Sequence, residues 1–378
     1  MLISMDNAGI NIEQILALIE KNQNISDLHL SAWECISYRL NWEIVREESA
    51  WKINSENMEI ILKQLFQWNP QRFDKFLWDK EADFAYVSKD GIPYRVNAYL
   101  KTWRIGVVMR KIWTKAKKLD EIMFSNLANS IRENVLKKDR WLFLVTGPTG
   151  CGKSTSIVSM LQEINETRSW NLITIEDPIE FIFKPEKCII SQREIWHDTR
   201  NVENALKAAL RQDPDILFVW EIRDRETAEA VLYLAETWHL VFSTLHTSSA
   251  ANTINRFISL FPTDIQSSVS ERVSEVLLGI QSQKLVKSKD GSTRVWVFEL
   301  MFNTSSVKNN IKQVDINQLD NIISTSNSVW MITMKQYAQI LLDRGIIDWS
   351  EINYLFDDVI KLNPNTQNNV KQNNVNVK

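Results

Sequence analysis

Hydrophobic and polar residues alternate in short stretches over the first third of the chain. Period-two alternation predicts strands at 26–30, 38–40, 43–45, 83–87, 93–99 and 107–112. Helical spacing of apolar residues predicts helices over 12–21 and 58–66. This mixture predicts a small α+β domain of residues 1–114, which ends at the basic joint Lys115–Lys118.

The pattern then changes to short, fully apolar runs separated by helical stretches. Buried strands are expected at 142–145, 172–175, 216–219 and 240–244, and helices over 122–136, 201–212 and 225–236. This alternation predicts an α/β domain with a mostly parallel sheet. Helices over 272–283 and 334–342 form its C-terminal region, so that the domain covers residues 115–362. Residues 363–378 are rich in Asn and Gln and lack apolar periodicity, which predicts a disordered tail.

The segment after the strand 142–145 fits the phosphate-loop pattern G-x-x-x-x-G-K-[ST]. Its glycines let the backbone surround a phosphate with N–H groups, and a helix that begins near Thr155 turns its positive end toward the anion. Lys153 would reach the β- and γ-phosphates and Ser154 would hold Mg²⁺. ATP and Mg²⁺ are therefore the predicted cofactors. The expected binding residues are Gly147, Pro148, Thr149, Gly150, Cys151, Gly152, Lys153, Ser154 and Thr155.

Other predicted strands also end in residues that can do chemistry. Glu180 follows the strand 172–175, Glu221 follows 216–219, and His246 follows 240–244. Parallel strands bring their carboxyl ends to one edge of the sheet, where ligands of α/β proteins bind. We therefore expect these residues near the phosphate loop.

Composition and charge exclude several classes of protein. The net charge of −3 gives no field that favours nucleic acid, and three distant cysteines argue against a disulfide scaffold and suit a reducing cytosol. No apolar run approaches the roughly 18 residues of a membrane span, and the N-terminus has no signal-peptide pattern. Nucleic-acid binding and a direct membrane span are not expected.

Four segments in this order resemble the secretion-type ATPases of type II secretion and type IV pili. The segment 147–155, the segment 173–180, the strand that ends at Glu221 and the segment 237–247 are similar to the Walker A motif, Asp box, Walker B motif and His box of that family. The run 221–227 also resembles the family. The resemblance covers residues 12–355 and is closest to the PilT type of pilus retraction ATPase. The signature Ser26–Leu30 opens the N-terminal domain as in that type, and Ser306–Gln313 aligns with a motif linked to retraction.

This resemblance implies an architecture and a cellular setting. It implies a PAS-like N-terminal domain, a RecA-like ATPase domain and a homo-hexameric ring. The ring would hydrolyse ATP to power pilus retraction and twitching motility. It would work in the cytoplasm at the inner face of the cytoplasmic membrane, held there by a pilus platform protein of the inner membrane.

The resemblance also assigns roles to residues. Glu180 would polarise the attacking water, and Glu221 would organise Mg²⁺, so that the metal residues are Ser154 and Glu221. His246 would sense the γ-phosphate, with His239 as a weaker second candidate. The remaining expected catalytic residues, some of them supplied by a neighbouring subunit, are Arg95, Arg104 and Arg110.

Two other functions remain open at this point. One is assembly of a pilus or of a type II secretion pseudopilus by the same chemistry. The other is a regulatory ring subunit that binds ATP without hydrolysing it. The bulky Trp220 beside Glu221 favours the second of these alternatives.

The balance of glycine and tryptophan is unusual. The chain has 9 Gly and 15 Trp, although roughly 26 glycines would be expected at the usual content. Asn41-Trp42 stands where a hairpin favours Asn-Gly, and Trp238 lies between a helix and a strand, where a glycine cap is common. We predict that many tryptophans are glycines in the living cell, encoded by UGA codons that mean glycine there; genuine tryptophans are the alternative. The positions at which the resembling family usually has glycine are Trp33, Trp42, Trp196, Trp220 and Trp238.

Overall fold

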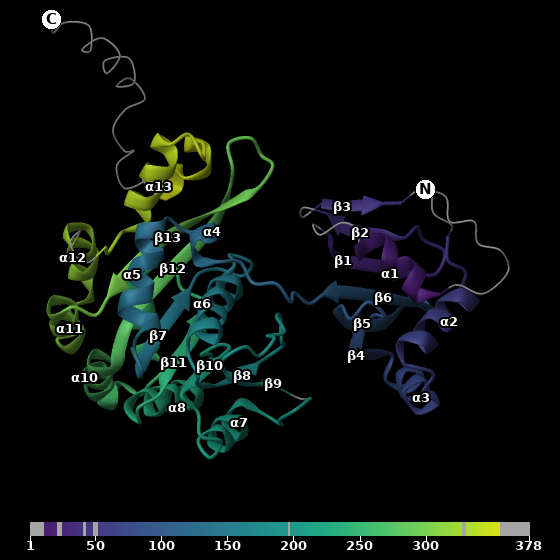
Figure 1. Cartoon of the computed structure of the whole chain (residues 1–378), viewed down its shortest axis with the longest axis horizontal. Coiled ribbons are helices and arrows are strands. Elements are labelled where there is room, and N and C mark those ends of the chain that lie inside the picture. The colour runs from purple at the N-terminus through teal and green to yellow at the C-terminus, as the bar shows by residue number, and fades with distance from the viewer. Residues whose placement is uncertain are drawn as a thin grey trace, which may run out of the picture. The chain divides into compact units, whose positions relative to one another are not determined.

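The computed structural model of the chain describes residues 11–20, 25–40, 43–47, 52–195, 197–326 and 330–355 (Figure 1). The chain forms two compact units, Met1–Lys115 with Glu180–Ile182, and Ala116–Ile179 with Phe183–Lys378. We call them the N-terminal unit and the C-terminal unit. The turn at Asn41-Trp42, Trp196 and the tail 363–378 lie outside the described residues.

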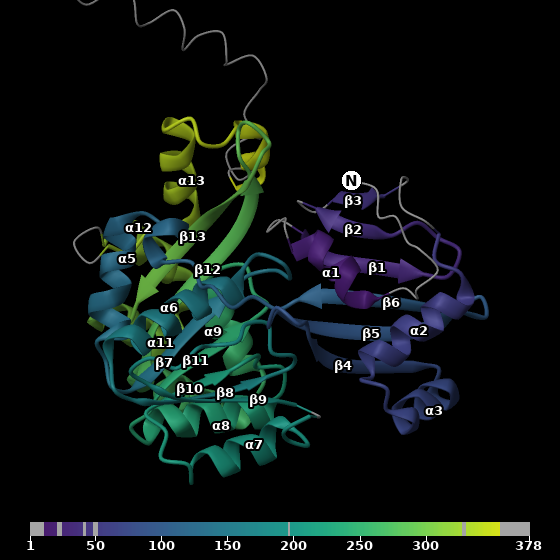
Figure 2. The ribbon, with the colours of Figure 1, turned by 45° about the vertical axis from the view of Figure 1, so that its right-hand side comes forward.

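The N-terminal unit is built on a six-stranded antiparallel sheet with the order β3-β2-β1-β6-β5-β4. Its strands are β1 Ile25–Ser31, β2 Ser37–Leu40, β3 Glu43–Arg46, β4 Glu81–Val87, β5 Pro93–Lys101 and β6 Arg104–Lys111. The helices α1 Ile12–Glu20, α2 Ser55–Leu65 and α3 Pro70–Asp79 pack on one face of this sheet (Figures 1 and 2). Alternating apolar residues of the strands, such as Leu28 and Met109, meet the apolar stripes of these helices in one core.

The C-terminal unit is built on a seven-stranded sheet with the order β13-β12-β7-β11-β10-β8-β9. Its strands are β7 Trp141–Thr146, β8 Asn171–Glu176, β9 Ile189–Glu194, β10 Ile216–Val219, β11 Leu240–Leu245, β12 Leu277–Lys287 and β13 Arg294–Phe302. All neighbours are parallel except β12 and β13, which form a long antiparallel ribbon (Figure 2). Strands β10 and β11 are buried along their whole length. The predicted α/β class, with a smaller α+β unit before it, is confirmed.

Helices join and flank these strands. Asn201 accepts a hydrogen bond from the Asn204 N–H at the start of α7, and Asp224 accepts one from the Thr227 N–H at the start of α8, so each side chain caps its helix. No described helix combines the length and the apolar character that crossing a membrane requires. The helices are α4 Leu119–Ile122, α5 Ser125–Ile131, α6 Lys153–Thr167, α7 Val202–Ala209, α8 Arg225–Glu236, α9 Ala250–Ser259, α10 Gln266–Val276, α11 Ser305–Lys312, α12 Leu319–Thr325 and α13 Met334–Asp343.

The helix expected over 272–283 is wrong in its second half. Helix α10 ends at Val276, and Leu277 begins strand β12 with φ −69° and ψ 130°. The strand lies between β7 and β13, and residues 277–283 at its start are all buried, so buried and exposed positions do not alternate there. A continuous apolar run of this kind cannot be told from a buried helix by periodicity alone. Strand β12 carries residues that hold the candidate site in place.

Candidate functional site

The phosphate loop joins the end of β7 to the start of α6. Gly147, Gly150 and Gly152 have φ of +146°, +75° and +85°, a region that side chains disfavour. A Cβ on Gly147 would lie 2.3 Å from the carbonyl oxygen of Gln283, so the loop has room only for glycine there. No side chain caps the N-terminus of α6 at Gly152, which leaves the first N–H groups of that helix available to an anion. The loop therefore fits a phosphate group.

Lys153 lies at the first position of α6 and turns back over the loop. Its Nζ donates hydrogen bonds to the carbonyl oxygens of Gly147, at 2.8 Å, and Pro148, at 3.2 Å. The same Nζ lies 3.5 Å from Nδ1 of His246. The ammonium group is thus held over the loop, where it can meet phosphate oxygens.

Glu221 and His246 meet beside this lysine. Strands β10 and β11 are parallel neighbours, so the residues after them reach the same edge of the sheet. Nε2 of His246 lies 3.3 Å from Oε1 of Glu221, and Nε of Arg223 donates to Oε2 of Glu221 at 2.8 Å. The Glu221 side chain is only 10% exposed. A histidine proton on Nε2 would face the carboxylate of Glu221 and leave Nδ1 as acceptor toward Lys153, which fits both contacts.

A buried amide on β12 holds the loop from behind. Nε2 of Gln283 donates to the carbonyl oxygen of Cys151 at 2.9 Å, and the Ser156 hydroxyl donates to Oε1 of Gln283 at 2.8 Å. Nε2 of Gln281 also donates to that Oε1, at 2.9 Å. Burial raises the pKa of the Cys151 thiol, with a smaller opposing effect of Lys153. Gln283 thus ties the loop and the first turns of α6 to one point of the sheet.

Buried hydroxyl groups join the end of β7 to the segment after His246. Oγ1 of Thr146 lies 2.9 Å from Oγ of Ser282 and 3.3 Å from Oγ1 of Thr253. Oγ1 of Thr253 in turn lies 2.7 Å from Oγ1 of Thr247. These residues and Gln283 are not among those expected from the sequence. The polar run Gln281-Ser282-Gln283 inside an apolar stretch was the available signal, because buried polar groups require partners.

Comparison with known proteins places this site in a family. Residues 82–336 match the family model described as Type II/IV secretion system protein. The chain belongs to that family. Over 338 residues it is 37% identical to the type IV pilus retractation ATPase PilT of Pseudomonas aeruginosa, which covers 89% of this chain and 95% of that protein. Over 267 residues it is 40% identical to a twitching motility protein of Neisseria gonorrhoeae, and this match covers 71% of this chain and 70% of that protein.

A solved structure of this secretion family has the same fold. The crystal structure of the pilus retraction motor PilT with bound ADP has a TM-score of 0.82 and 31% identity, and the match covers 95% of this chain and 98% of that one. The match thus spans both units of the chain. The RecA-like ATPase architecture expected from the sequence is therefore confirmed.

Glu180 and the three expected arginines belong to the N-terminal unit. Glu180 is exposed and opens the segment Glu180–Ile182, in which the Ile182 N–H donates to the Trp113 carbonyl oxygen at 3.1 Å. Arg95 and Arg110 face each other across β5 and β6. Nε of Arg110 donates to Oδ1 of the buried Asp27 at 2.7 Å.

The two remaining candidates are Arg104 of the N-terminal unit and His239 of the C-terminal unit. Arg104 is exposed at the tip of the hairpin between β5 and β6. His239 comes just before β11, and its Nδ1 lies 3.0 Å from the Leu234 carbonyl oxygen. Because β11 separates His239 from His246, His239 lies at the opposite edge of the sheet. It is therefore outside the network of Lys153, Glu221 and His246.

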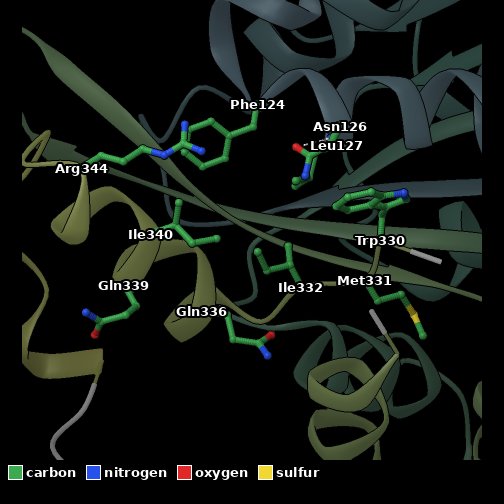
Figure 3. Close-up of a pocket in the computed structure, with 10 residues that line it drawn as sticks. All are labelled: Phe124, Asn126, Leu127, Trp330, Met331, Ile332, Gln336, Gln339, Ile340 and Arg344. Atoms are coloured by element: carbon green, nitrogen blue, oxygen red, sulfur yellow. Dashed lines mark hydrogen bonds between the residues drawn. The ribbon is translucent and has the colours of Figure 1, made fainter. Parts of the chain in front are cut away.

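A separate pocket of about 400 Å³ opens in the C-terminal unit (Figure 3). The Arg344 guanidinium lies 4.3 Å from the centre of the Phe124 ring at one end, and Trp330 stands at the other end. Its lining is mostly apolar and has no acid that could hold a metal ion. We assign it no part in nucleotide chemistry.

Proposed function

We propose that this protein is the ATP-hydrolysing motor of type IV pilus retraction. The observation that carries the proposal is the contact of one imidazole, that of His246, with both the phosphate-loop Lys153 and the acidic Glu221. A motor must couple the state of its nucleotide to its own structure, and this contact lies where a terminal phosphate would be sensed. Relatives that match along most of the chain carry retraction and twitching names, which favours retraction over assembly.

The residues of the C-terminal unit suit ATP with Mg²⁺. Lys153 and the N-terminus of α6 would bind the phosphates, and Ser154 in the first turn of α6 would bind Mg²⁺ together with Glu221. Bound Mg²⁺ supplies positive charge to the phosphate oxygens. Glu180 would act as the base that orients water, and His246 would read the terminal phosphate.

The assembly we propose is a homo-hexamer. The domain of residues 1–114 would contribute Arg95, Arg104 and Arg110, and the domain of residues 115–362 would carry the nucleotide site. Arginine side chains stabilise the charge of phosphoryl transfer when a neighbouring subunit supplies them. The ring would act in the cytoplasm on an inner-membrane pilus platform protein, without nucleic acid as a ligand.

Hydrolysis and retraction can be tested separately. The purified protein should release phosphate from ATP only when Mg²⁺ is present, and Lys153→Ala should abolish turnover while the circular-dichroism spectrum and thermal unfolding stay as in the parent. Turnover that survives Lys153→Ala would show that the site is elsewhere.

Deletion of the gene tests the direction of movement. Loss of retraction should leave cells with excess surface pili and no twitching, and the Lys153→Ala gene should fail to restore twitching. Cells without pili would instead identify an assembly motor. A parent protein that binds ATP and releases no phosphate would identify a regulatory ring subunit.

A further inference from the structure

We propose that six of the tryptophans are glycines in the natural protein, read from UGA codons. Twelve of the fifteen tryptophans lie in the described residues, and six of them have φ between +57° and +88°. Only five of all the other described non-glycine residues have positive φ. Six of the eight described glycines share this conformation. Tryptophan in this chain thus follows the backbone preference of glycine. The six positions are Trp33, Trp68, Trp103, Trp141, Trp238 and Trp330.

The physical basis is the clash of Cβ with the backbone in the left-handed region. Bulky residues with positive φ are outliers, whereas glycine adopts this region at no steric cost. A genuine tryptophan would be strained at each of these six positions. Six tryptophans at positions of positive φ are therefore not expected in one natural chain.

The hairpin between β5 and β6 shows the requirement directly. Lys101 pairs with Arg104, and the two residues between them, Thr102 and Trp103, have φ of +47° and +66°. A two-residue loop with positive φ at both positions is the type I′ turn, for which glycine is the favoured second residue. The Trp103 side chain is 97% exposed, so no packing offsets the strain.

Two of the six tryptophans follow helix ends. After α2, the Gln67 N–H donates to the Gln64 carbonyl oxygen and the Trp68 N–H donates to that of Lys63, the paired bonds of a Schellman motif. Gln67 takes the usual glycine position of this motif, and Trp68 follows it with a positive φ of its own, +58°. After α8, Trp238 follows the C-cap Thr237 with φ +70°, where glycine is the usual residue.

The environment of the indoles supports the same conclusion. No described tryptophan is buried, although phenylalanines such as Phe143 and Phe242 fill the core. Trp141 and Trp238 do gain contacts with the Arg140 guanidinium, at 4.9 and 4.0 Å, but such cation–π contacts are weak at an exposed site. Large aromatic side chains normally stabilise a protein by burying apolar surface, and none of these side chains is buried.

The structure changes which positions are assigned to glycine. Of the five positions expected from the sequence, Trp33 and Trp238 have positive φ, and Trp42 and Trp196 lie outside the described residues. Trp220 does not have positive φ, so its backbone gives no support. Trp68, Trp103, Trp141 and Trp330 are assigned by the backbone alone. Glycine at Trp330 would also remove the wall at one end of the pocket of Figure 3.

The decisive experiment reads the gene and the protein from the cells in which it occurs. The six codons should be UGA, and the tryptic peptide of residues 141–153 should be lighter than its tryptophan form by the difference between a tryptophan and a glycine residue. UGG at these codons, or the tryptophan mass in the natural peptide, would overturn the proposal.

A stability comparison tests the physical argument with recombinant protein. The chain with glycine at all six positions should unfold at a higher temperature than the all-tryptophan chain. Trp78→Gly in α3 and Trp296→Gly in β13 are the matched controls, because neither residue has positive φ, and glycine there should lower the unfolding temperature. If the six changes lower it as the controls do, the left-handed turns do not require glycine. Neither readout depends on ATPase activity, so the outcome is separate from that of the proposed function.

Discussion

Nε2 of His246 lies 3.3 Å from Oε1 of Glu221, while Nδ1 of the same ring lies 3.5 Å from Nζ of Lys153. One imidazole thus connects the residue that would neutralise the terminal phosphate with the residue that would organise the metal ion. A ligand that draws Lys153 or Glu221 away would change the contacts of the ring. The next residue, Thr247, contacts Thr253 of α9 through its hydroxyl group, at 2.7 Å.

His246→Ala should slow turnover more than it weakens binding. Removal of the ring leaves the phosphate loop intact but releases Glu221 from one of its two partners, so kcat should fall by about ten- to a hundredfold with a small change in KM for ATP. Steady-state phosphate release measures both constants. His239→Ala is the control and should leave both unchanged, because His239 lies at the other edge of the sheet. Equal effects of the two substitutions would contradict the role of His246.

Gln283→Leu should weaken nucleotide binding as well as stability. Leucine keeps the volume but removes the bonds to the Cys151 carbonyl oxygen and the Ser156 hydroxyl, so the loop loses its support. Unsatisfied buried groups cost about 1–3 kcal/mol in free energy of unfolding. The dissociation constant of a fluorescent ATP analogue should rise, and the free energy of unfolding should fall.

The matched control for this substitution is Asn165→Leu. Asn165 is a buried amide in the last turn of α6, where it donates to the Lys184 carbonyl oxygen at 2.8 Å and accepts from the Glu186 N–H. This variant should lose comparable stability and keep its nucleotide affinity. If both variants bind the analogue like the parent, Gln283 has only a structural role.

Glu299 should make stability depend on pH. Burial raises its pKa from 4.5 to about 7, although the Ala250 N–H, which donates to it at 2.7 Å, acts in the opposite direction. Between these two pH values the unfolded chain ionises this carboxyl and the folded chain keeps it protonated, so the unfolded state binds fewer protons. The stabilisation by this group is therefore complete below pH 4.5 and is lost as the pH rises toward 7.

The variant Glu299→Gln isolates this effect. Glutamine keeps an acceptor for the Ala250 N–H and cannot ionise, so the free energy of unfolding should no longer fall between pH 4.5 and 7. Over this pH range the free energy of unfolding of the parent should fall by on the order of 3 kcal/mol more than that of the variant. Urea unfolding at several pH values measures it, and parallel curves for parent and variant would refute a raised pKa.

The sequence predicts the parts of the site whose signals are local. The phosphate loop is contiguous, and Glu221 and His246 each follow a strand whose apolar run marks it as buried. The support from β12 was not predicted, because Gln283 is more than a hundred residues from the loop in sequence and its strand resembles a helix in composition. Sheet order, which brings β12 beside β7, is set by tertiary packing rather than by local pattern.

The backbone conformations of the tryptophans could also be predicted only in part from the sequence. The composition and the position before β11 identify Trp238, but Trp103 and Trp141 have no such signal in the sequence. Their φ values follow from the register of β5 with β6 and from the hydrogen bond of the Trp141 N–H with the His239 carbonyl oxygen. The second of these is a long-range pairing, and the first depends on the exact register of a hairpin, so neither can be obtained from the neighbouring residues alone.

Arg110 allows a test of whether neighbouring subunits complete each other's nucleotide sites. If Arg110 acts on the nucleotide of a neighbour, then Lys153→Ala and Arg110→Ala should each abolish activity, and rings that contain both variants should recover part of it. Each mixed ring would hold some sites with an intact Lys153 and an intact Arg110 from different chains. Phosphate release after mixing, with mixed rings verified by native mass spectrometry, measures the recovery.

The control for this experiment concerns the bond between Arg110 and Asp27. Loss of Arg110 leaves the buried Asp27 carboxylate with Arg39 at 3.9 Å, so Arg110→Ala could reduce activity by destabilising the N-terminal unit. Arg110→Ala with Asp27→Asn removes the buried charge together with its partner and should restore the unfolding temperature without restoring activity. Activity regained in that double variant would assign Arg110 a structural role, and mixed rings that stay inactive would exclude its action on a neighbour.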